Sequence, residues 1–252
     1  MNSKPIILIC MCGILFACAT TIDRGNFGPF MRSLNNKSYG YLAVPDSTGS
    51  APTDMIEIFN VRPGDCSYNE GWNDCQKDRE RSELSEINKS TNSNSEYWYG
   101  WFIYFPEDYI NVYPTKVALG QFHQEGSHPV WMFQNSDGGY HLDNQVKGYT
   151  ERYYLLIKES ELRGRWHKIE IHARWAKDDS GFMYVWVNGE KKVDFQGQTM
   201  DASKVYFKYG LYRSFLSRYK KAKNVDEVPA QKVYFANVKR CKSRNKLVPK
   251  SK

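Results

Sequence analysis

Short runs of alternating apolar and polar residues, separated by turn residues, recur along most of the chain and constrain its fold more than any other feature. Alternation with a period of two places every second side chain on one face, as in half-buried β-strands. Gly138-Gly139 and Asn188-Gly189 are typical hairpin turns. The expected strands span residues 39–44, 55–61, 79–87, 97–105, 116–123, 130–133, 140–146, 153–157, 166–175, 182–187, 204–212 and 232–239.

Helical patterns are rare in the same sequence. We expect one helix at residues 214–222 and a turn at 107–110. Many short strands with few helices favour an all-β fold of two antiparallel sheets, a sandwich or jelly roll. The chain has 252 residues, of which 41% are hydrophobic, and this is enough for one domain of that kind.

The N-terminus has the pattern of an export signal over residues 1–17. Lys4 precedes an apolar stretch at 5–16 that is too short to span a bilayer. Residues 15–18 resemble a bacterial lipobox, which would place a lipid on Cys18 and leave 18–35 as a tether, although Phe16 fits that motif poorly. The alternative is ordinary signal cleavage after Ala19. Both predict an exported protein, and we favour the lipoprotein, held to a membrane by its N-terminal lipid.

Export permits disulfides. Cys10 and Cys12 leave with the signal, and Cys66 and Cys75 flank a polar turn at 67–74, so we expect these two to pair. Cys241 would then be unpaired, although the cysteine count does not settle the pairing. No Cys/His spacing resembles a zinc site.

The net charge is +7, which favours an anionic partner such as nucleic acid, a membrane surface or an acidic polysaccharide. Part of this charge lies in the C-terminal residues 242–252, which we expect to form a solvated basic tail.

Three of the expected strands carry polar side chains that alternation places on one face. In the first, Arg79, Arg81 and Glu83 share a face, so that Glu83 could hold an arginine for bidentate capture of a carboxylate. In the second, Gln121 and His123 share a face.

The third strand places Tyr206, Lys208, Gly210 and Tyr212 on one face, where Gly210 would leave room for a ligand. Each motif also has a structural explanation. The arginine and glutamate could be an ordinary ion pair, a strand histidine is often structural, and tyrosine with lysine can form the rim of a sheet.

Taken in this order, Arg-x-Glu, Gln-x-His and Lys-x-Gly-x-Tyr resemble the active-site strands of jelly-roll polysaccharide lyases. That group includes alginate lyases, glucuronan lyases and heparin lyase I. Residues 166–172 and 185–189 are similar to core strands of the heparin lyase I and glucuronan lyase branch. The resemblance covers about residues 35–240. It implies a concanavalin A-like β-jelly roll over 36–241 that cleaves a uronic-acid polymer by β-elimination.

The resemblance also implies roles for these residues. Removal of the proton at C5, next to the carboxylate, leaves a dianion, which Arg81 and Gln121 would neutralise. His123 would assist or act as base, and Tyr212 would transfer protons. Lys208 would hold Tyr212 or a substrate oxygen, and cationic Lys208 and Arg81 would lower the pKa of the Tyr212 phenol.

Substrate-binding roles fall to Arg79, Glu83 and Tyr206. Alginate lyases usually carry Arg-x-Glu-x-Arg, but here the last position is Ser85. This difference favours a glucuronate-type polymer over alginate, with Arg79 as a substitute anchor.

The expected enzyme needs no metal or other cofactor. Calcium remains open, although nothing in the sequence indicates a site for it. We expect a monomer whose partner is an anionic polysaccharide and not nucleic acid. Two alternatives are a non-catalytic carbohydrate-binding module and a glycoside hydrolase on a related sandwich. The hydrolase needs two carboxylates across a cleft, and no Glu-x-Asp-x-x-Glu strand is found.

Overall fold

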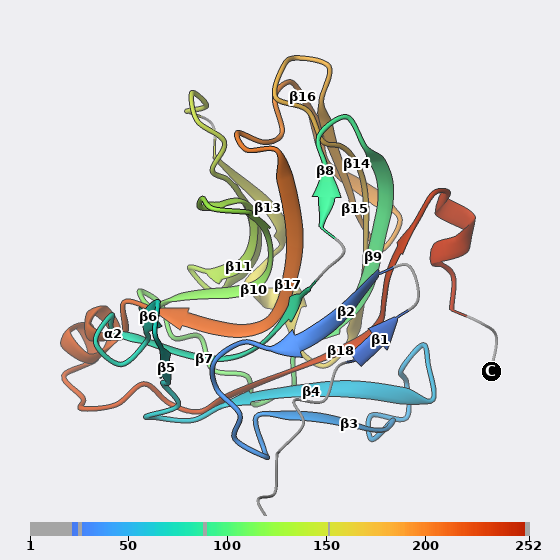
Figure 1. Ribbon diagram of the computed structural model, residues 1–252. Helices are drawn as coiled ribbons and strands as arrows, with labels where there is room; N and C mark the ends of the chain where they lie inside the picture. The colour runs from blue at the N-terminus through green and yellow to red at the C-terminus, as the bar shows by residue number, and fades with distance from the viewer. Residues whose placement is uncertain (1–21, 25–26, 88–89, 151, 250–252) are drawn as a thin grey trace, which may run out of the picture.

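Two large antiparallel sheets contain most of the chain in the computed structural model, which describes residues 22–24, 27–87, 90–150 and 152–249 (Figure 1). Sheet A runs in the order β1-β2-β7-β17-β10-β11-β12-β13, with β8 also paired to β17. Its strands are β1 (Ile22–Arg24), β2 (Phe27–Arg32), β7 (Arg79–Glu86), β8 (Thr91–Asn92), β10 (Lys116–Gln124), β11 (Pro129–Ser136), β12 (Gly139–Asn144), β13 (Tyr153–Ile157) and β17 (Lys204–Ser214).

Sheet B runs in the order β16-β15-β14-β9-β18-β4-β3. Its strands are β3 (Tyr41–Pro45), β4 (Met55–Val61), β9 (Glu96–Tyr104), β14 (Trp166–Arg174), β15 (Phe182–Val187), β16 (Glu190–Gln196) and β18 (Gln231–Cys241). The remaining elements are the hairpin β5 (Tyr68–Asn69) and β6 (Trp72–Asn73), the helices α1 (Glu159–Leu162) and α2 (Leu216–Lys223), and the 3-10 helix η1 (Arg244–Leu247). The expected all-β jelly roll of two antiparallel sheets is confirmed.

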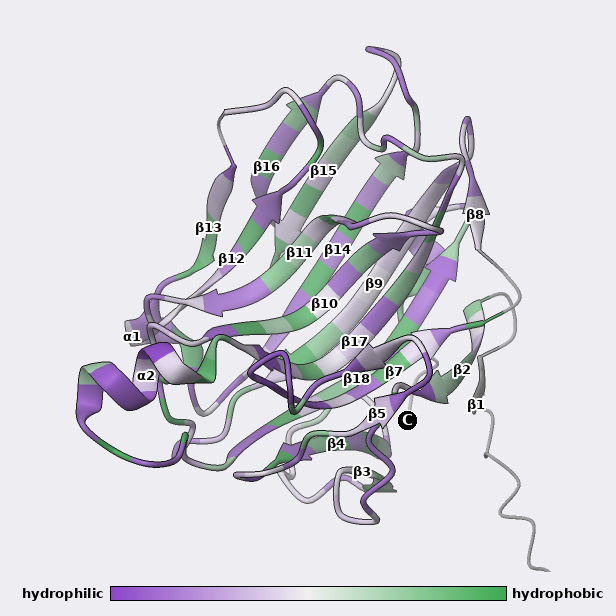
Figure 2. Ribbon diagram, turned by 60° about the vertical axis from the view of Figure 1, so that its left-hand side comes forward, coloured by the Kyte–Doolittle hydropathy of each residue, from purple (hydrophilic) through white to green (hydrophobic). Residues whose placement is uncertain are grey.

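The core lies between the sheets and is rich in aromatic rings. Phe59 of sheet B packs edge-on against Tyr209 of sheet A, with ring centroids 5.4 Å apart. Bands of apolar and polar residues alternate along the strands in Figure 2, as expected for strands with one face in this core.

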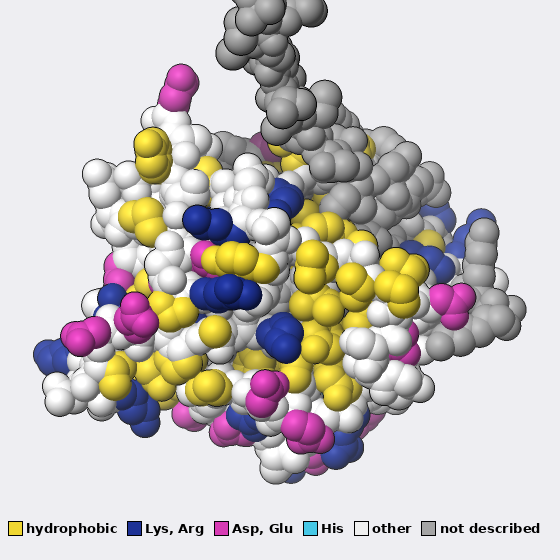
Figure 3. All heavy atoms as spheres, turned by 90° about the horizontal axis from the view of Figure 1, so that it is seen from below, with side chains coloured by type: hydrophobic (Ala, Val, Ile, Leu, Met, Phe, Trp, Pro, Cys, Tyr) yellow, Lys and Arg dark blue, Asp and Glu magenta, His cyan; other side chains and the backbone are white. Residues whose placement is uncertain are grey.

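Sheet B departs from that pattern because its outer face is also partly apolar. Ile56 and Ala236 form a second small cluster there with Ala51, which belongs to the loop between β3 and β4. Figure 3 views the molecule from the side on which β3 and β4 lie, and apolar side chains gather on that surface. Leu42 of β3 and Met55 of β4 are 41% and 51% exposed.

Every expected strand has a counterpart, but β2, β16 and the short β1, β5, β6 and β8 were not expected. The hairpin at Asn188-Gly189 is confirmed, since both residues have positive φ and join β15 to β16. The other hairpin turns at Asp137-Gly138, one residue earlier than expected. Helix α2 begins later than expected because β17 continues through Ser214.

The expected tether at 18–35 is wrong for residues 27–32, which form strand β2. Phe27 and Phe30 are buried in the core, and β2 pairs with β7. The expected solvated tail at 242–252 is likewise wrong in part. Leu247 is buried, and Arg244 pairs with Glu170 of β14 at 3.0 Å, so η1 packs on sheet B.

The expected signal peptide at 1–17 and the lipidation site Cys18 lie outside the described residues. No helix in the described part of the chain is both long and apolar enough to cross a membrane.

Candidate active site

The outer face of sheet A is concave, because β17 bends along its length (Figure 1). A bulge between Ala118 and Gly120 shifts the pairing of β10 with β17. Gly210 lies beside this bulge with φ of 133°, a backbone conformation that favours glycine. A Cβ there would lie 2.5 Å from the backbone oxygen of Ser82 and 2.6 Å from the ring of Phe59. The expectation that Gly210 leaves room for a ligand is therefore wrong, since its missing side chain leaves room for the core.

A groove of about 550 Å³ lies on this concave face. Its walls include side chains from β7, β10 and β17, as the three sequence motifs predict. The expected residues that line it are Arg79, Arg81, Gln121, His123, Tyr206, Lys208 and Tyr212, and other residues in its lining are Ser33, Asn69, Trp72, Lys116, Met132, Gln145, Ser214 and Phe215. The expected site residues thus lie together on one face, with Glu83 behind them.

Glu83 is a buried anion that organises the floor of the groove. Its carboxylate accepts a hydrogen bond from Gln121 and pairs with Lys208 at 2.7 Å. Arg81 approaches the same carboxylate at 3.4 Å. Lys208 therefore neutralises Glu83, and it is Glu83, not Tyr212, that its ammonium group contacts.

Arg81 is held by a residue that the sequence analysis did not single out. Its Nε and Nη2 both donate to the carboxylate of Asp74, each at 2.6 Å. Burial alone would lower the pKa of Arg81, but the bond to Asp74 and the charge of Glu83 outweigh it and raise that pKa. The edge of the guanidinium expected to capture a substrate carboxylate is thus occupied by Asp74, and Arg81 lies with its Cζ 4.0 Å from the ring centroid of Tyr212.

Arg79 has a different environment. It donates to Ser214 Oγ at 2.7 Å and lies near the rings of Trp72, Tyr212 and Phe215, between 5.3 and 5.7 Å from their centroids. It forms no ion pair with a carboxylate in the described part of the chain, and its Nε is buried without a partner there. Arg79 is therefore a cation in the groove whose guanidinium still has N–H groups that can donate to a ligand.

A second cationic cluster lies farther along the concave face and was also missed. The carboxylate of Asp143 is fully buried and pairs with Lys116 at 3.3 Å and Arg152 at 3.1 Å. Lys116 lines the groove, so this cluster places a further cation there. No motif in the sequence connects these three residues, which lie on different strands and a loop.

His123 has one ring nitrogen that can accept a proton. Its Nδ1 lies 3.0 Å from the backbone oxygen of Gln124, which can only accept, so Nδ1 carries the hydrogen and Nε2 has the lone pair. Burial lowers the pKa of His123, and nearby Lys208 lowers it further against the effect of the Gln124 carbonyl. The imidazole is neutral at pH 7.

Tyr212 instead keeps its proton at neutral pH. Burial raises its pKa, and the charges of Arg81 and Arg79 only partly oppose this. The expected lowering of the Tyr212 pKa by Lys208 and Arg81 is wrong, because desolvation outweighs the cations. Its hydroxyl makes no hydrogen bond to another described residue. Burial also raises the pKa of Tyr206, to about 12.

The Cys66–Cys75 disulfide is present, as expected, with Cα atoms 5.1 Å apart, and Cys241 is free. Among the residues that the structure describes, no group of three or more His, Cys, Asp or Glu side chains could hold a metal ion.

Several solved structures have a similar fold. An endo-β-1,4-glucuronan lyase from the fungus Trichoderma reesei matches with a TM-score of 0.62 and 16% identity, over 88% of this chain and 95% of that one. An alginate lyase from Corynebacterium sp. has a TM-score of 0.54 and 15% identity, over 82% and 83%. A GH131 β-glucanase catalytic domain from Podospora anserina has a TM-score of 0.56 and 11% identity, over 86% of each chain. A sugar hydrolase therefore shares this fold, and the fold alone does not identify the reaction.

The sequence makes that distinction. Residues 35–239 match the family described as polysaccharide lyase, and the chain belongs to that family. It is an enzyme, a polysaccharide lyase. No curated protein matches the sequence.

Proposed function

We propose that this lyase cleaves a uronic-acid polymer by β-elimination, with His123 as the base and Tyr212 as the acid. The observation that carries the proposal is a groove in which a neutral imidazole and a protonated phenol lie on one face beside Arg79. Each titratable group has the protonation state that its role requires at neutral pH.

The reaction follows from these states. His123 Nε2 takes the proton from C5 of the uronate, and the resulting negative charge spreads into the carboxylate, where Arg79 stabilises it. The C4–O bond then breaks as a C4–C5 double bond forms, and the Tyr212 hydroxyl gives its proton to the departing oxygen. A proton lost from His123 and one gained by Tyr212, through water, restore the enzyme.

Arg79 is the carboxylate anchor in this proposal, since the guanidinium of Arg81 is already engaged. We expect Arg79→Ala to raise KM by about 10- to 100-fold, because a hydrogen bond to a charged group contributes about 1.5–3 kcal/mol. Arg79→Lys keeps the charge but loses the fork, and it should recover part of the loss. Steady-state kinetics on a cleaved polymer measure both. An unchanged KM in Arg79→Ala would remove Arg79 from substrate binding.

We further propose a glucuronate-type polymer in preference to alginate. Ser85 stands where alginate lyases usually carry an arginine, and the solved structure of a glucuronan lyase has a higher TM-score than that of the Corynebacterium alginate lyase. Ultraviolet absorbance of the new double bond, followed on glucuronan, alginate, heparan-type and ulvan-type chains, tests both proposals. Cleavage of alginate alone would contradict the preference, and no elimination product from any uronate polymer would contradict the reaction.

We also propose that the enzyme acts outside the cytoplasm, anchored by a lipid on Cys18. The Cys66–Cys75 disulfide supports export, because such bonds persist in oxidising compartments. Cys18→Ser should move the protein from the membrane fraction to the soluble fraction, as measured by fractionation of the producing cells. Continued membrane association of this variant would contradict the anchor.

A further inference from the structure

We propose that Asp74, held in place by the Cys66–Cys75 disulfide, is a positioning residue that sets Arg81 against Tyr212. The inference rests on the proposed role of Tyr212 in proton transfer. It concerns a residue outside the three sequence motifs and a disulfide that would otherwise only stabilise a loop.

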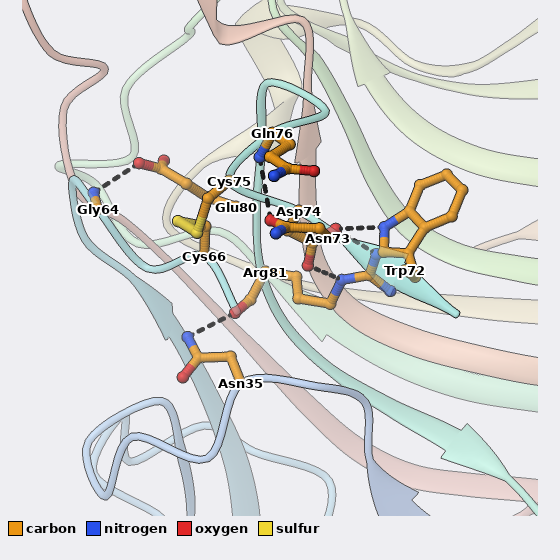
Figure 4. The surroundings of a disulfide bond; sticks show 10 residues. All are labelled: Asn35, Gly64, Cys66, Trp72, Asn73, Asp74, Cys75, Gln76, Glu80 and Arg81. Carbon is orange, nitrogen blue, oxygen red and sulfur yellow. Dashed lines mark hydrogen bonds and ion pairs between the residues drawn. A yellow bond between two sulfur atoms is a disulfide. The ribbon is translucent and has the colours of Figure 1, made fainter. Parts of the chain in front are cut away.

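Asp74 has no exposed surface, and its carboxylate faces two side chains of the groove wall. Oδ1 and Oδ2 each accept a hydrogen bond from Arg81, and Oδ1 also accepts one from the indole nitrogen of Trp72 at 2.8 Å. Figure 4 shows Trp72 and Arg81 converging on this carboxylate, directly beside the disulfide. A paired carboxylate and guanidinium have one preferred geometry, so Asp74 determines the plane of the Arg81 guanidinium.

The backbone around Asp74 is fixed from both ends of the disulfide loop. The backbone amide of Asp74 donates to the backbone oxygen of Ser67, and the backbone oxygen of Asp74 accepts from the amide of Arg79 at 3.0 Å. The backbone oxygen of Asp65, the residue next to Cys66, accepts from the amide of Arg81 at 3.0 Å. The disulfide therefore joins the two segments that hold the backbone and the side chain of Arg81.

Arg81 transmits this position to Tyr212. The two residues are direct partners across β7 and β17, and the guanidinium carbon lies 4.0 Å from the ring centroid. A cation at that distance attracts the ring and restricts its orientation. The chain of contacts thus runs from the disulfide through Asp74 and Arg81 to the phenol, and the side chains of Asp74, Arg81 and Tyr212 are all buried.

The test is a double-mutant cycle on the intact enzyme. We expect Asp74→Asn to lower kcat by about 10- to 100-fold while changing KM by less than about 3-fold, as expected when a reacting group is displaced and substrate binding is kept. In an Arg81→Ala background the same substitution should lower kcat no further, because Asp74 acts only through Arg81. Equal losses in both backgrounds would overturn the proposal, since a merely structural residue would impair either one.

Thermal unfolding of the same variants separates folding from positioning. Arg81→Ala removes the cation that compensates the buried Asp74 carboxylate, which should lower the melting temperature. Adding Asp74→Asn removes that buried charge, so the double variant should have a higher melting temperature than Arg81→Ala alone. Glu170→Gln is the matched control, since Glu170 is also a buried carboxylate paired with an arginine but lies on β14 of the other sheet. It should keep the parental kcat.

The disulfide provides a second measurement that does not depend on the Asp74 variants. A Cys66→Ser/Cys75→Ser variant should have a low kcat. Reductant should lower the kcat of the parent but should not change the kcat of this variant. Full activity of that variant would overturn the role of the disulfide. Full activity of Arg81→Ala, or an impaired Arg81→Ala with a parental Asp74→Asn, would contradict only the present inference, because the proposed proton transfers use His123 and Tyr212. Full activity of Tyr212→Phe would instead contradict the chemistry assigned to this face.

Discussion

Tyr212→Phe is expected to lower turnover by about 10²–10⁴-fold, the range typical of a lost proton-transfer group. The substitution keeps the ring, which is largely buried and packs with Ala118 and Met132, but removes the only exchangeable proton of the side chain. Without it the departing oxygen must leave as an alkoxide or find a proton in water. Substrate binding should change little, because Arg79 and the ring remain in place. Single-turnover kinetics and equilibrium binding on the same polymer measure the two effects separately.

Tyr184→Phe is the control for this experiment. Tyr184 lies on β15 of sheet B, whereas the groove motifs lie on β7, β10 and β17 of sheet A. Its hydroxyl accepts a hydrogen bond from Gln196. It should retain the parental rate. If Tyr212→Phe also does so on a confirmed substrate, the acid is another residue, and His123 with Lys208 becomes the pair to test.

His123→Ala is expected to lower kcat/KM by a similar factor of about 10²–10⁴, since His123 is the proposed base. The alternative is that Tyr212 serves as both base and acid. In that case the loss in His123→Ala would be small, because the phenol would retain both roles. His172→Gln, on β14 of the other sheet, is the control histidine and should leave kcat/KM unchanged.

The pH dependence of kcat/KM gives the same prediction an independent signature. A base must be neutral to accept a proton, so activity falls as the pH drops through the pKa of His123. Because burial lowers that pKa, the acid limb should lie below about 6.5, the usual value for histidine. An acid must be protonated, and because burial raises the pKa of Tyr212, no alkaline loss should occur below about pH 10. His123→Ala should abolish the acid limb in its residual activity, and a limb that persists would assign it to another group.

Local sequence patterns predicted much of the fold and the contents of the groove. Strand alternation placed Arg79 and Arg81, Gln121 and His123, and Lys208 and Tyr212 on the faces where the structure has them. It did so because a period of two is a property of the extended backbone itself. The pairing of Cys66 with Cys75 was also accessible, since it depends on segments close together in the chain. Strand β2 escaped notice because Gly28 and Pro29 are typical of turns, and only pairing with β7 makes that segment a strand.

The sequence by itself determined that the side chains of the three motifs, apart from Gly210, share the concave face of this lyase, and the tertiary structure decided their charge and contacts. Asp74 reaches Arg81 only because the disulfide loop folds back on β7, so no spacing in the chain reveals it. The same contact engages Arg81 and leaves Arg79 as the anchor. The pKa of Tyr212 rises because burial depends on every neighbour packed around the phenol, whereas the nearby cations were visible in the motif. Alternation sets the direction of a side chain, but desolvation and ion pairing depend on residues that only the folded chain brings together.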